Sequence, residues 1–291
     1  MNKEPNKNIY ELVTDMILEK IDAGVAPWIK PWNFHTPKNF KSSKDYRGIN
    51  NTILSMCAGE TGLFGTFKQL KEEGVKVSKG AKSIPVVFHM FKDLDSPNSR
   101  GQDRAYIGAK YYRVFRIEDT DNGEEQLKGK FDLEDFLPLA PELRNEKIEG
   151  DLGQMVSGLG LKLTFDENSA FYSPSKHLLN MPKYKNFKTI DGYYATFFHE
   201  LVHSTSKDLC RDMKGHFGSK DYSFEELVAE LGSAYLCQIY EVSNEELAQS
   251  ASYIKGWSSK FSEDKKMIFK ASSLAQLAVD HLINKTESVP F

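Results

Sequence analysis

The stretch Phe198-His199-Glu200-Leu201-Val202-His203-Ser204 decides how this chain is interpreted, because it contains the pattern His-Glu-x-x-His. Residues four apart in an α-helix lie on one face, one turn above the other, so both imidazoles can reach a single Zn²⁺. Glu200 follows the first histidine, and its carboxylate can take a proton from a water that the zinc has acidified. The pattern is typical of zinc-dependent peptide hydrolysis.

The alternative is a helix with two packed or solvated histidines. Aromatic and aliphatic residues surround the motif and indicate a buried helix: Tyr193, Tyr194, Phe197, Phe198, Leu201 and Val202. Buried histidines need polar partners, and a metal ion supplies one. The surroundings therefore favour a metal site over the alternative.

A zinc site needs a third protein ligand, and the segment 223–231 downstream offers three glutamates. Glu226 and Glu230 are four residues apart on one helical face, where two carboxylates would repel each other in solvent. The run Glu226-Leu-Val-Ala-Glu230 resembles the Glu-x-x-x-Asp arrangement of thermolysin-type zincins, in which the first acid is the ligand. This resemblance implies Glu226 as the third ligand and Glu230 as the acceptor of a histidine N–H. Glu225 and Glu230 remain alternatives for the ligand, and a solvated acidic face is the explanation without function.

Composition places the chain among globular proteins. With 291 residues, 40% apolar and 27% charged, it suits two domains of ordinary size. No apolar run approaches the length of a membrane span, and the first residues lack the apolar segment of a signal peptide, so we expect a cytoplasmic protein without a membrane partner. Three widely spaced cysteines, Cys57, Cys210 and Cys237, fit reduced thiols.

The net charge of −3 conceals a difference between the two halves. Residues 1–130 carry 21 Lys and Arg against 17 Asp and Glu, whereas residues 131–291 carry 17 against 24. A basic first half is weak support for a polyanionic partner, since mildly basic surfaces also occur in proteins that bind no nucleic acid.

Hydrophobic periodicity predicts an α+β fold with two domains, residues 1–130 and 150–291, joined by a linker at residues 131–149. The first domain is expected to hold helices at 8–24, 52–58 and 66–74 and strands at 84–91 and 106–117. The second is expected to hold three strands and five helices, near 147–158, around the His-Glu-x-x-His motif, around Glu226, and near 244–261 and 264–282. The predicted strands are 161–165, 170–172 and 177–182, and the last of them is the candidate for pairing with an extended substrate.

Aromatic residues of the first domain alternate with basic ones, as in grooves where unpaired bases stack on rings and cations follow the phosphates. For each ring taken singly, a place in the core is the more common explanation. Taken together, the set predicts contacts to single-stranded DNA from eight residues: Trp28, Lys30, Trp32, Tyr46, Arg47, Asn50, Lys68 and Lys79.

Several stretches along nearly the whole chain resemble the ArdC-like antirestriction proteins of conjugative plasmids and related mobile elements. These stretches are Pro27-Trp-Ile-Lys-Pro-Trp32, Tyr46-Arg-Gly-Ile-Asn50, Thr66-Phe-Lys-Gln69, Tyr112-Arg-Val-Phe115, His199-Glu-Leu-Val-His203 and Phe224-Glu-Glu-Leu-Val-Ala-Glu-Leu231. The resemblance implies an N-terminal domain that binds single-stranded DNA and a C-terminal domain of the zincin-like metallopeptidase type. It also implies a role in protecting incoming DNA from host restriction.

The sequence thus predicts a divalent metal, zinc or a similar ion, on His199, His203 and Glu226, with Glu200 as general base. The expected partners are single-stranded DNA and a DNA-associated protein as peptidase substrate. Two other functions remain open: a DNA-binding protein whose metal domain is structural or vestigial, and a metallopeptidase of ordinary cytosolic substrates whose first domain recognises protein.

Overall fold

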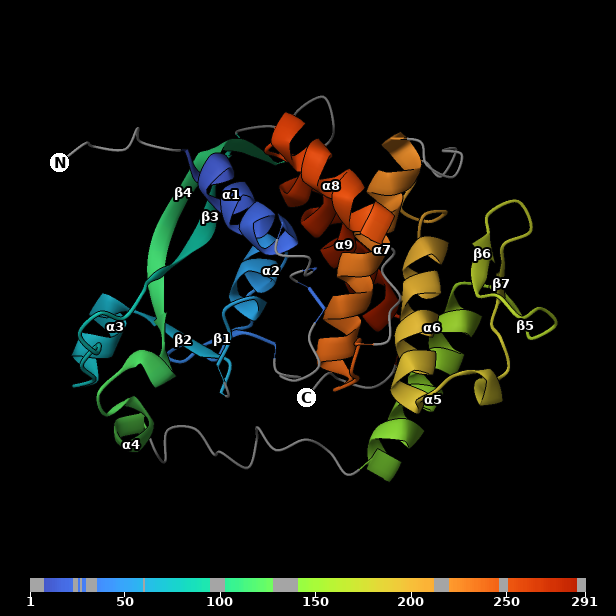
Figure 1. Cartoon of the computed structure of the whole chain (residues 1–291), viewed down its shortest axis with the longest axis horizontal. Helices are drawn as coiled ribbons and strands as arrows, with labels where there is room; N and C mark the ends of the chain where they lie inside the picture. Colours follow the sequence, from blue (N-terminus) through green and yellow to red (C-terminus); the bar gives the residue numbers. More distant parts are fainter. Residues whose placement is uncertain are drawn as a thin grey trace.

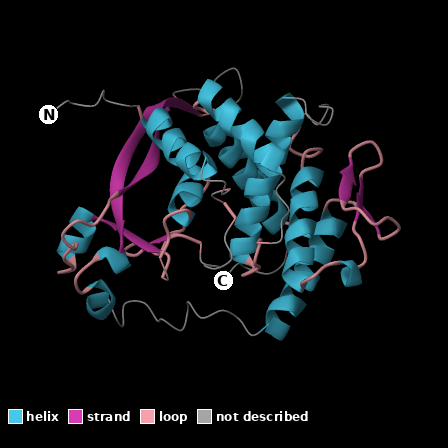
Figure 2. Cartoon of the chain, in the orientation of Figure 1, coloured by secondary structure: helices cyan, strands magenta, loops and turns pink. Residues whose placement is uncertain are grey.

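The structure is a computed structural model that describes residues 8–22, 26, 28–29, 36–59, 61–94, 103–127, 141–211, 220–245 and 251–286. Its described helices and strands form two sheets and a group of long helices, which confirms the predicted α+β class. Figure 1 shows the larger sheet at one end of the molecule, the smaller sheet at the other, and long helices between them. Helices dominate the second part of the chain (Figure 2).

The N-terminal part contains the larger sheet and short helices around it. Its helices are α1 (Ile9–Asp22), α2 (Ile49–Ser55), α3 (Phe67–Glu72) and α4 (Gly123–Leu127), with the 3-10 turn η1 (Ile117–Asp119). Its strands are β1 (Lys38–Asn39), β2 (Leu63–Thr66), β3 (Ile84–Asp93) and β4 (Arg104–Arg116). α3 begins with a capping box, in which Thr66 and Gln69 satisfy each other's backbone N–H groups.

β3 and β4 form a long antiparallel hairpin that dominates this sheet, whose strand order is β1-β2-β4-β3. Ile84 lies opposite Val114 at one end and Asp93 opposite Arg104 at the other, with a register shift between Met90 and Phe91. The first four residues of β3 are buried, but most of the remaining hairpin is exposed. The far half of the hairpin therefore extends beyond the core (Figure 1).

The C-terminal part is built on long helices with a small sheet on one side. The helices are α5 (Pro141–Gly158), α6 (Ile190–Ser204), α7 (Lys220–Ile239), α8 (Ala251–Glu263) and α9 (Met267–Ile283), with the 3-10 turn η3 (Tyr184–Asn186). The strands are β5 (Lys162–Thr164), β6 (Phe171–Ser173) and β7 (Leu178–Asn180). α7 packs between α6 and α9. Among the described residues, no helix combines the length and the apolar character that crossing a lipid bilayer requires.

The order of the small sheet corrects one prediction. The strand predicted at 177–182 is β7, and it is the central strand, pairing with β5 on one side and with β6 on the other. A strand with two neighbours has no free backbone groups to offer a substrate, so β7 cannot pair with one. Within the described part of the chain, the edge strand that lies beside α6 is β6.

The two parts share one hydrophobic core. α1 packs on α8 and α2 on α9, and one buried cluster contains residues from all of these elements. Side chains also cross the boundary: Thr14 donates to the carbonyl of Lys265 at 2.8 Å, and Thr52 lies 2.6 Å from the hydroxyl of Tyr235. The predicted linker at 131–149 overlaps the first half of α5, which begins at Pro141.

Candidate metal centre

The two motif histidines lie on α6, whose first turn is capped by the Thr189 hydroxyl accepting the N–H of Gly192. The helix is buried through Tyr194, Phe197, Phe198 and Leu201, among others. His199 and His203 are one turn apart on the same face, and their Nε2 atoms are 3.1 Å from each other. Helical spacing therefore brings both nitrogens to one point, as the sequence predicts.

Glu226 comes to this point from α7. Its two carboxylate oxygens lie 3.5 Å from His199 Nε2 and 3.4 Å from His203 Nε2. One donor atom from each of the three residues lies within 4.8 Å of the others. Two imidazoles and a carboxylate on two facing helices are a donor set that suits zinc and similar divalent ions, so the residues fit a metal.

The close packing of α6 on α7 sets the distance between Glu226 and the two histidines. A side chain at Gly232 would meet the Val202 methyl groups at 2.8 and 2.9 Å, so only glycine lets the helices approach this closely. In the next position, the Ser233 hydroxyl donates to the carbonyl of Ala195 at 2.9 Å. Both contacts lie further along α7 than the ligand and hold it against α6.

Glu225 takes a role that the sequence did not predict. Its Oε1 lies 3.4 Å from His203 Nδ1, the ring nitrogen that does not face Glu226. Arg211 donates two hydrogen bonds, of 2.8 and 3.1 Å, to the same carboxylate. It also donates one to the carbonyl of Val202 near the end of α6. An acid that fixes a ligating histidine in this way orients the ring and raises its basicity.

The sequence predicts Glu230 as the acceptor of a histidine N–H, and that role stays a prediction; at His203 Nδ1 the neighbouring carboxylate is that of Glu225. Glu230 lies one turn further along α7 and raises the pKa of His199 by its charge. Glu225 also ceases to be a candidate ligand, since its carboxylate is held by Arg211 on the far side of the His203 ring. No sequence pattern indicated a role for Arg211, because this residue lies outside both motifs.

Glu200 is buried on α6 directly after His199. Its charge helps to raise the pKa of both His199 and His203, which places the carboxylate close to the two rings. Glu200 does not belong to the cluster of possible metal ligands that His199, His203 and Glu226 form. This arrangement leaves the Glu200 carboxylate next to the candidate ligands but not among them.

The charges of the two histidines and the neighbouring glutamates influence one another strongly. Burial lowers the pKa of His203, but hydrogen bonds to Glu225 and Glu226 outweigh it and raise the pKa to about 10. For His199, burial also opposes protonation, and the bond to Glu226 again reverses it, so that its pKa is raised. Burial raises the pKa of the Glu226 carboxyl, whereas the two histidines pull it well below its usual range. Both histidines therefore favour the protonated form, and a dication that binds them would have to displace these protons.

We expect cation affinity to rise with pH. A metal ligates only a neutral imidazole, so it must displace the proton that His203 holds up to about pH 10. As pH rises from about 6 to about 8, the apparent Kd should fall roughly tenfold per pH unit for each proton displaced. Competition with a fluorescent chelator, corrected for the chelator's own protonation, measures this. A Kd that stays constant with pH would show that no histidine proton leaves.

The residues predicted to contact DNA do not form one surface. Lys30 and Trp32 lie outside the described residues. Trp28 is 5% exposed and packs edge-to-face on Trp257 of α8, so its ring cannot reach a base, which contradicts the prediction for this residue. Lys68 and Lys79 are exposed.

The other three take part in structural contacts. Tyr46 packs on Phe64, and burial raises its pKa. Nη2 of Arg47 donates to both carboxylate oxygens of Asp280 on α9. The Asn50 amide donates to and accepts from the backbone of Val87, which extends β3 along its free edge. Of these three, Arg47 joins the two parts of the chain while its side chain stays exposed, whereas Tyr46 and Asn50 have their partners within the N-terminal part.

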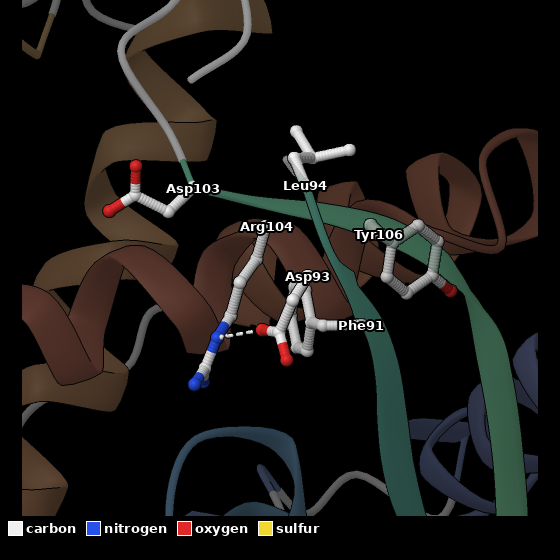
Figure 3. Close-up of a pocket in the computed structure, with 6 residues that line it drawn as sticks. All are labelled: Phe91, Asp93, Leu94, Asp103, Arg104 and Tyr106. Atoms are coloured by element: carbon white, nitrogen blue, oxygen red, sulfur yellow. Dashed lines mark hydrogen bonds and ion pairs between the residues drawn. The ribbon is translucent and has the colours of Figure 1, made fainter. Parts of the chain in front are cut away.

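Two hollows lie away from the metal centre. Tyr46, Arg47 and Asp280 are among the residues that line one of about 460 Å³ between the two parts. The other, of about 820 Å³, lies at the far end of the β3–β4 hairpin, where Arg104 pairs with Asp93 at 2.8 Å (Figure 3). Its remaining lining residues are Phe91, Leu94, Asp103 and Tyr106. Two carboxylates against one guanidinium give this second hollow a negative balance.

Comparison with known proteins gives a consistent family. The family described as the N-terminal domain of anti-restriction factor ArdC matches residues 7–115, and the family described as zincin-like metallopeptidase matches residues 151–274. The uncharacterized protein y4eC of Sinorhizobium fredii (strain NBRC 101917 / NGR234) is 32% identical over 94% of this chain and 91% of its own length. A DNA primase TraC of Escherichia coli is 30% identical over 97% of this chain, which spans 20% of that protein.

Solved structures agree with the sequence comparison. The metal-free crystal structure of the antirestriction ArdC protein from the R388 plasmid has a TM-score of 0.74 and 31% identity, covering 96% of this chain and 98% of that one. The Mn(II)-bound structure of the same protein has a TM-score of 0.72 with the same identity and coverage. With both halves matched in order and the metal-ligating cluster in the second half, the chain belongs to the ArdC family of antirestriction proteins, with a zincin-like domain.

Proposed function

We propose that this protein binds single-stranded DNA through its N-terminal part and hydrolyses peptide bonds at a divalent metal in its C-terminal part. The observation that carries the second activity is the meeting of His199, His203 and Glu226 beside Glu200. Three protein ligands leave room for a further group, as catalytic rather than purely structural zinc sites do.

His199, His203 and Glu226 would hold the cation. When bound, such an ion supplies Lewis-acid chemistry, polarising a carbonyl and making water more acidic. Two nitrogen donors and one oxygen favour zinc, whereas the relative from the R388 plasmid has a Mn(II)-bound form. Elemental analysis of the purified protein decides between the two ions.

The chain's own residues would supply the proton transfers and the rigidity. Glu200 would accept a proton from the attacking water and pass it to the leaving amine, the role of a general base and then a general acid. Glu225 keeps the His203 ring in one orientation, and Arg211 keeps Glu225 in place. Because Arg211 also bonds the carbonyl of Val202, the ring and the end of α6 are held as one unit.

An extended peptide would pair with the edge of the small sheet. β6 is the edge strand beside α6, and its residues Phe171, Tyr172 and Ser173 pair on their other side with β7. Adding a strand to such an edge gives main-chain hydrogen bonds that do not depend on the peptide's sequence. This suits a substrate presented as an unfolded segment of a DNA-associated protein.

Three observations support single-stranded DNA as the partner of the N-terminal part. Residues 7–115 match the N-terminal domain of anti-restriction factor ArdC, and residues 1–130 carry a surplus of basic residues. Large aromatic side chains are also exposed on the β3–β4 hairpin. The role we propose is protection of DNA that a mobile element brings into the cytoplasm, where host restriction enzymes act.

Binding to an oligonucleotide is expected to weaken steeply with salt. Each lysine or arginine that neutralises a phosphate of a single strand contributes about −0.7 to the slope of log K against log salt concentration. Anisotropy titrations of the full-length chain with labelled oligo(dT) measure the slope. The full chain is required because α1 and α2 pack on α8 and α9, so an isolated N-terminal fragment would lose part of its core.

The same titration separates the remaining functions. Equal affinity at low and high salt would contradict an electrostatic contact with the backbone. Absence of any binding would favour a peptidase whose first domain recognises protein. DNA binding without peptide hydrolysis would favour a protein that coats DNA and keeps a structural metal domain.

A further inference from the structure

Exposed aromatic residues are concentrated on one element, the β3–β4 hairpin. Of the eleven large hydrophobic side chains that are exposed in the described part of the chain, six belong to this hairpin: Phe88, Phe91, Tyr106, Ile107, Tyr111 and Tyr112. Scattered single exposures are ordinary on a protein surface, but a contiguous group marks a binding surface. Which face of the hairpin binds a ligand depends on the residues that each face carries.

Strand pairing assigns these residues to two faces. Phe88 lies directly opposite Lys110, and Tyr112 is two residues further along β4, so the three side chains share a face. The rings of Phe88 and Tyr112 meet edge-to-face, with centroids 6.1 Å apart. Lys92 lies four residues after Phe88 on the same strand and therefore on the same face.

The opposite face holds a different group. Phe91 lies opposite Tyr106, with ring centroids 5.9 Å apart, and His89 also contacts the Tyr106 ring. This face leads to the hollow of Figure 3, where Arg104 is already paired with Asp93. Tyr106 is further tied to α1 by a 3.0 Å contact with the Tyr10 hydroxyl.

Charge distinguishes the two faces. Lys92 and Lys110 are exposed, and neither has a carboxylate at ion-pair distance among the described residues. At the far end of the opposite face, Arg104 is neutralised by Asp93, and Asp103 adds a second negative charge. Nearer the core, the same face carries Arg113, which lies over the Tyr111 ring and donates to the Ser83 hydroxyl. A polyanion is therefore attracted to the face of Phe88 and Tyr112 more than to the Asp93–Arg104 end of the opposite face.

We propose that the hairpin face formed by Phe88, Tyr112, Lys110 and Lys92 is the surface that holds single-stranded DNA. Unpaired bases stack on the two rings, and the two lysines contact neighbouring phosphates. Paired bases would keep their faces covered by the duplex, so this surface selects single strands. The inference rests on the proposed function and gives its DNA-binding activity a location.

The test compares matched variants of the full-length chain for binding to labelled oligo(dT). Phe88→Ala and Tyr112→Ala are each expected to weaken binding roughly tenfold. Lys110→Gln should weaken it by a few-fold and reduce the salt slope by about 0.7. All three side chains are exposed, so the fold should persist, and circular dichroism checks this.

Controls lie on the same two strands. Phe91 on β3 is 57% exposed, close to the 55% of Phe88, and Arg104 on β4 matches Lys110 in charge. Phe91→Ala and Arg104→Gln are expected to bind oligo(dT) within twofold of the unchanged chain. If the controls weaken binding as much as Phe88→Ala, or if the variants at Phe88 and Tyr112 bind normally, this surface is not the DNA site. Failure of the unchanged chain to bind any oligonucleotide would instead contradict the proposed function.

Discussion

Replacing Glu200 by glutamine is expected to reduce peptide hydrolysis roughly 10²- to 10⁴-fold, the usual contribution of a general acid–base group. The amide has nearly the size of the carboxylate, so α6 should keep its packing, but it cannot accept the proton. The change leaves His199, His203 and Glu226 intact, and the cation should therefore remain bound. Hydrolysis of a denatured protein substrate and metal content of the same sample measure both effects.

A matched control is Glu142→Gln, because Glu142 is an exposed acid on α5. It should hydrolyse substrate at the rate of the unchanged chain. Restriction of incoming DNA can then be compared in cells that carry each form. Should protection survive Glu200→Gln undiminished, the peptidase activity is not the basis of antirestriction, and the protein acts by binding DNA.

Removing the carboxylate of Glu226 is expected to weaken cation binding roughly 10²- to 10³-fold. Structural zinc sites with four ligands gain about 10–16 kcal/mol, which is about 2.5–4 kcal/mol for each ligand. Glu226→Gln keeps the shape of the side chain and replaces a charged donor by a neutral amide. Isothermal titration with Zn²⁺ and with Mn²⁺ gives the affinity of each variant.

The neighbouring glutamates provide the controls, since all three lie on α7. Glu225→Gln should cost about 10- to 100-fold, the usual effect of a residue that orients a ligating histidine. Glu230→Gln should have the smallest effect, because its influence on His199 is exerted through charge. If Glu230→Gln abolished binding and Glu226→Gln did not, the third ligand would be Glu230, and the geometry described above would need revision.

Local periodicity was sufficient for the main features of the centre. A helix places residues four apart on one face, so His199 and His203 were predicted to converge from spacing alone. The hairpin strands were likewise predictable, because their alternation and the polar stretch between them are local signals. Glu226 required the resemblance to zincins, since three glutamates in one segment offered equivalent chemistry.

Burial of aromatic residues was not predictable from the sequence. Trp28 and Phe88 both lie near basic residues, but Trp28 packs on Trp257 from a helix over two hundred residues away, whereas Phe88 is 55% exposed. Whether a ring belongs to the core depends on which distant element covers it. The sequence contains the ring but not the distant element that covers it, so the predicted contact of Trp28 with DNA was wrong.

The sequence by itself determined the chemistry of this protein: the histidine pair, its adjacent acid and the α+β class follow from local spacing, which every helix or strand imposes on its own residues. Only the tertiary structure decided which residues and strands from distant segments of the chain become neighbours. Arg211, beyond the end of α6, binds Glu225 on α7, β7 lies between two other strands, and the two parts share a core. Each of these depends on how separate elements pack, and packing is set by contacts between residues far apart in the chain.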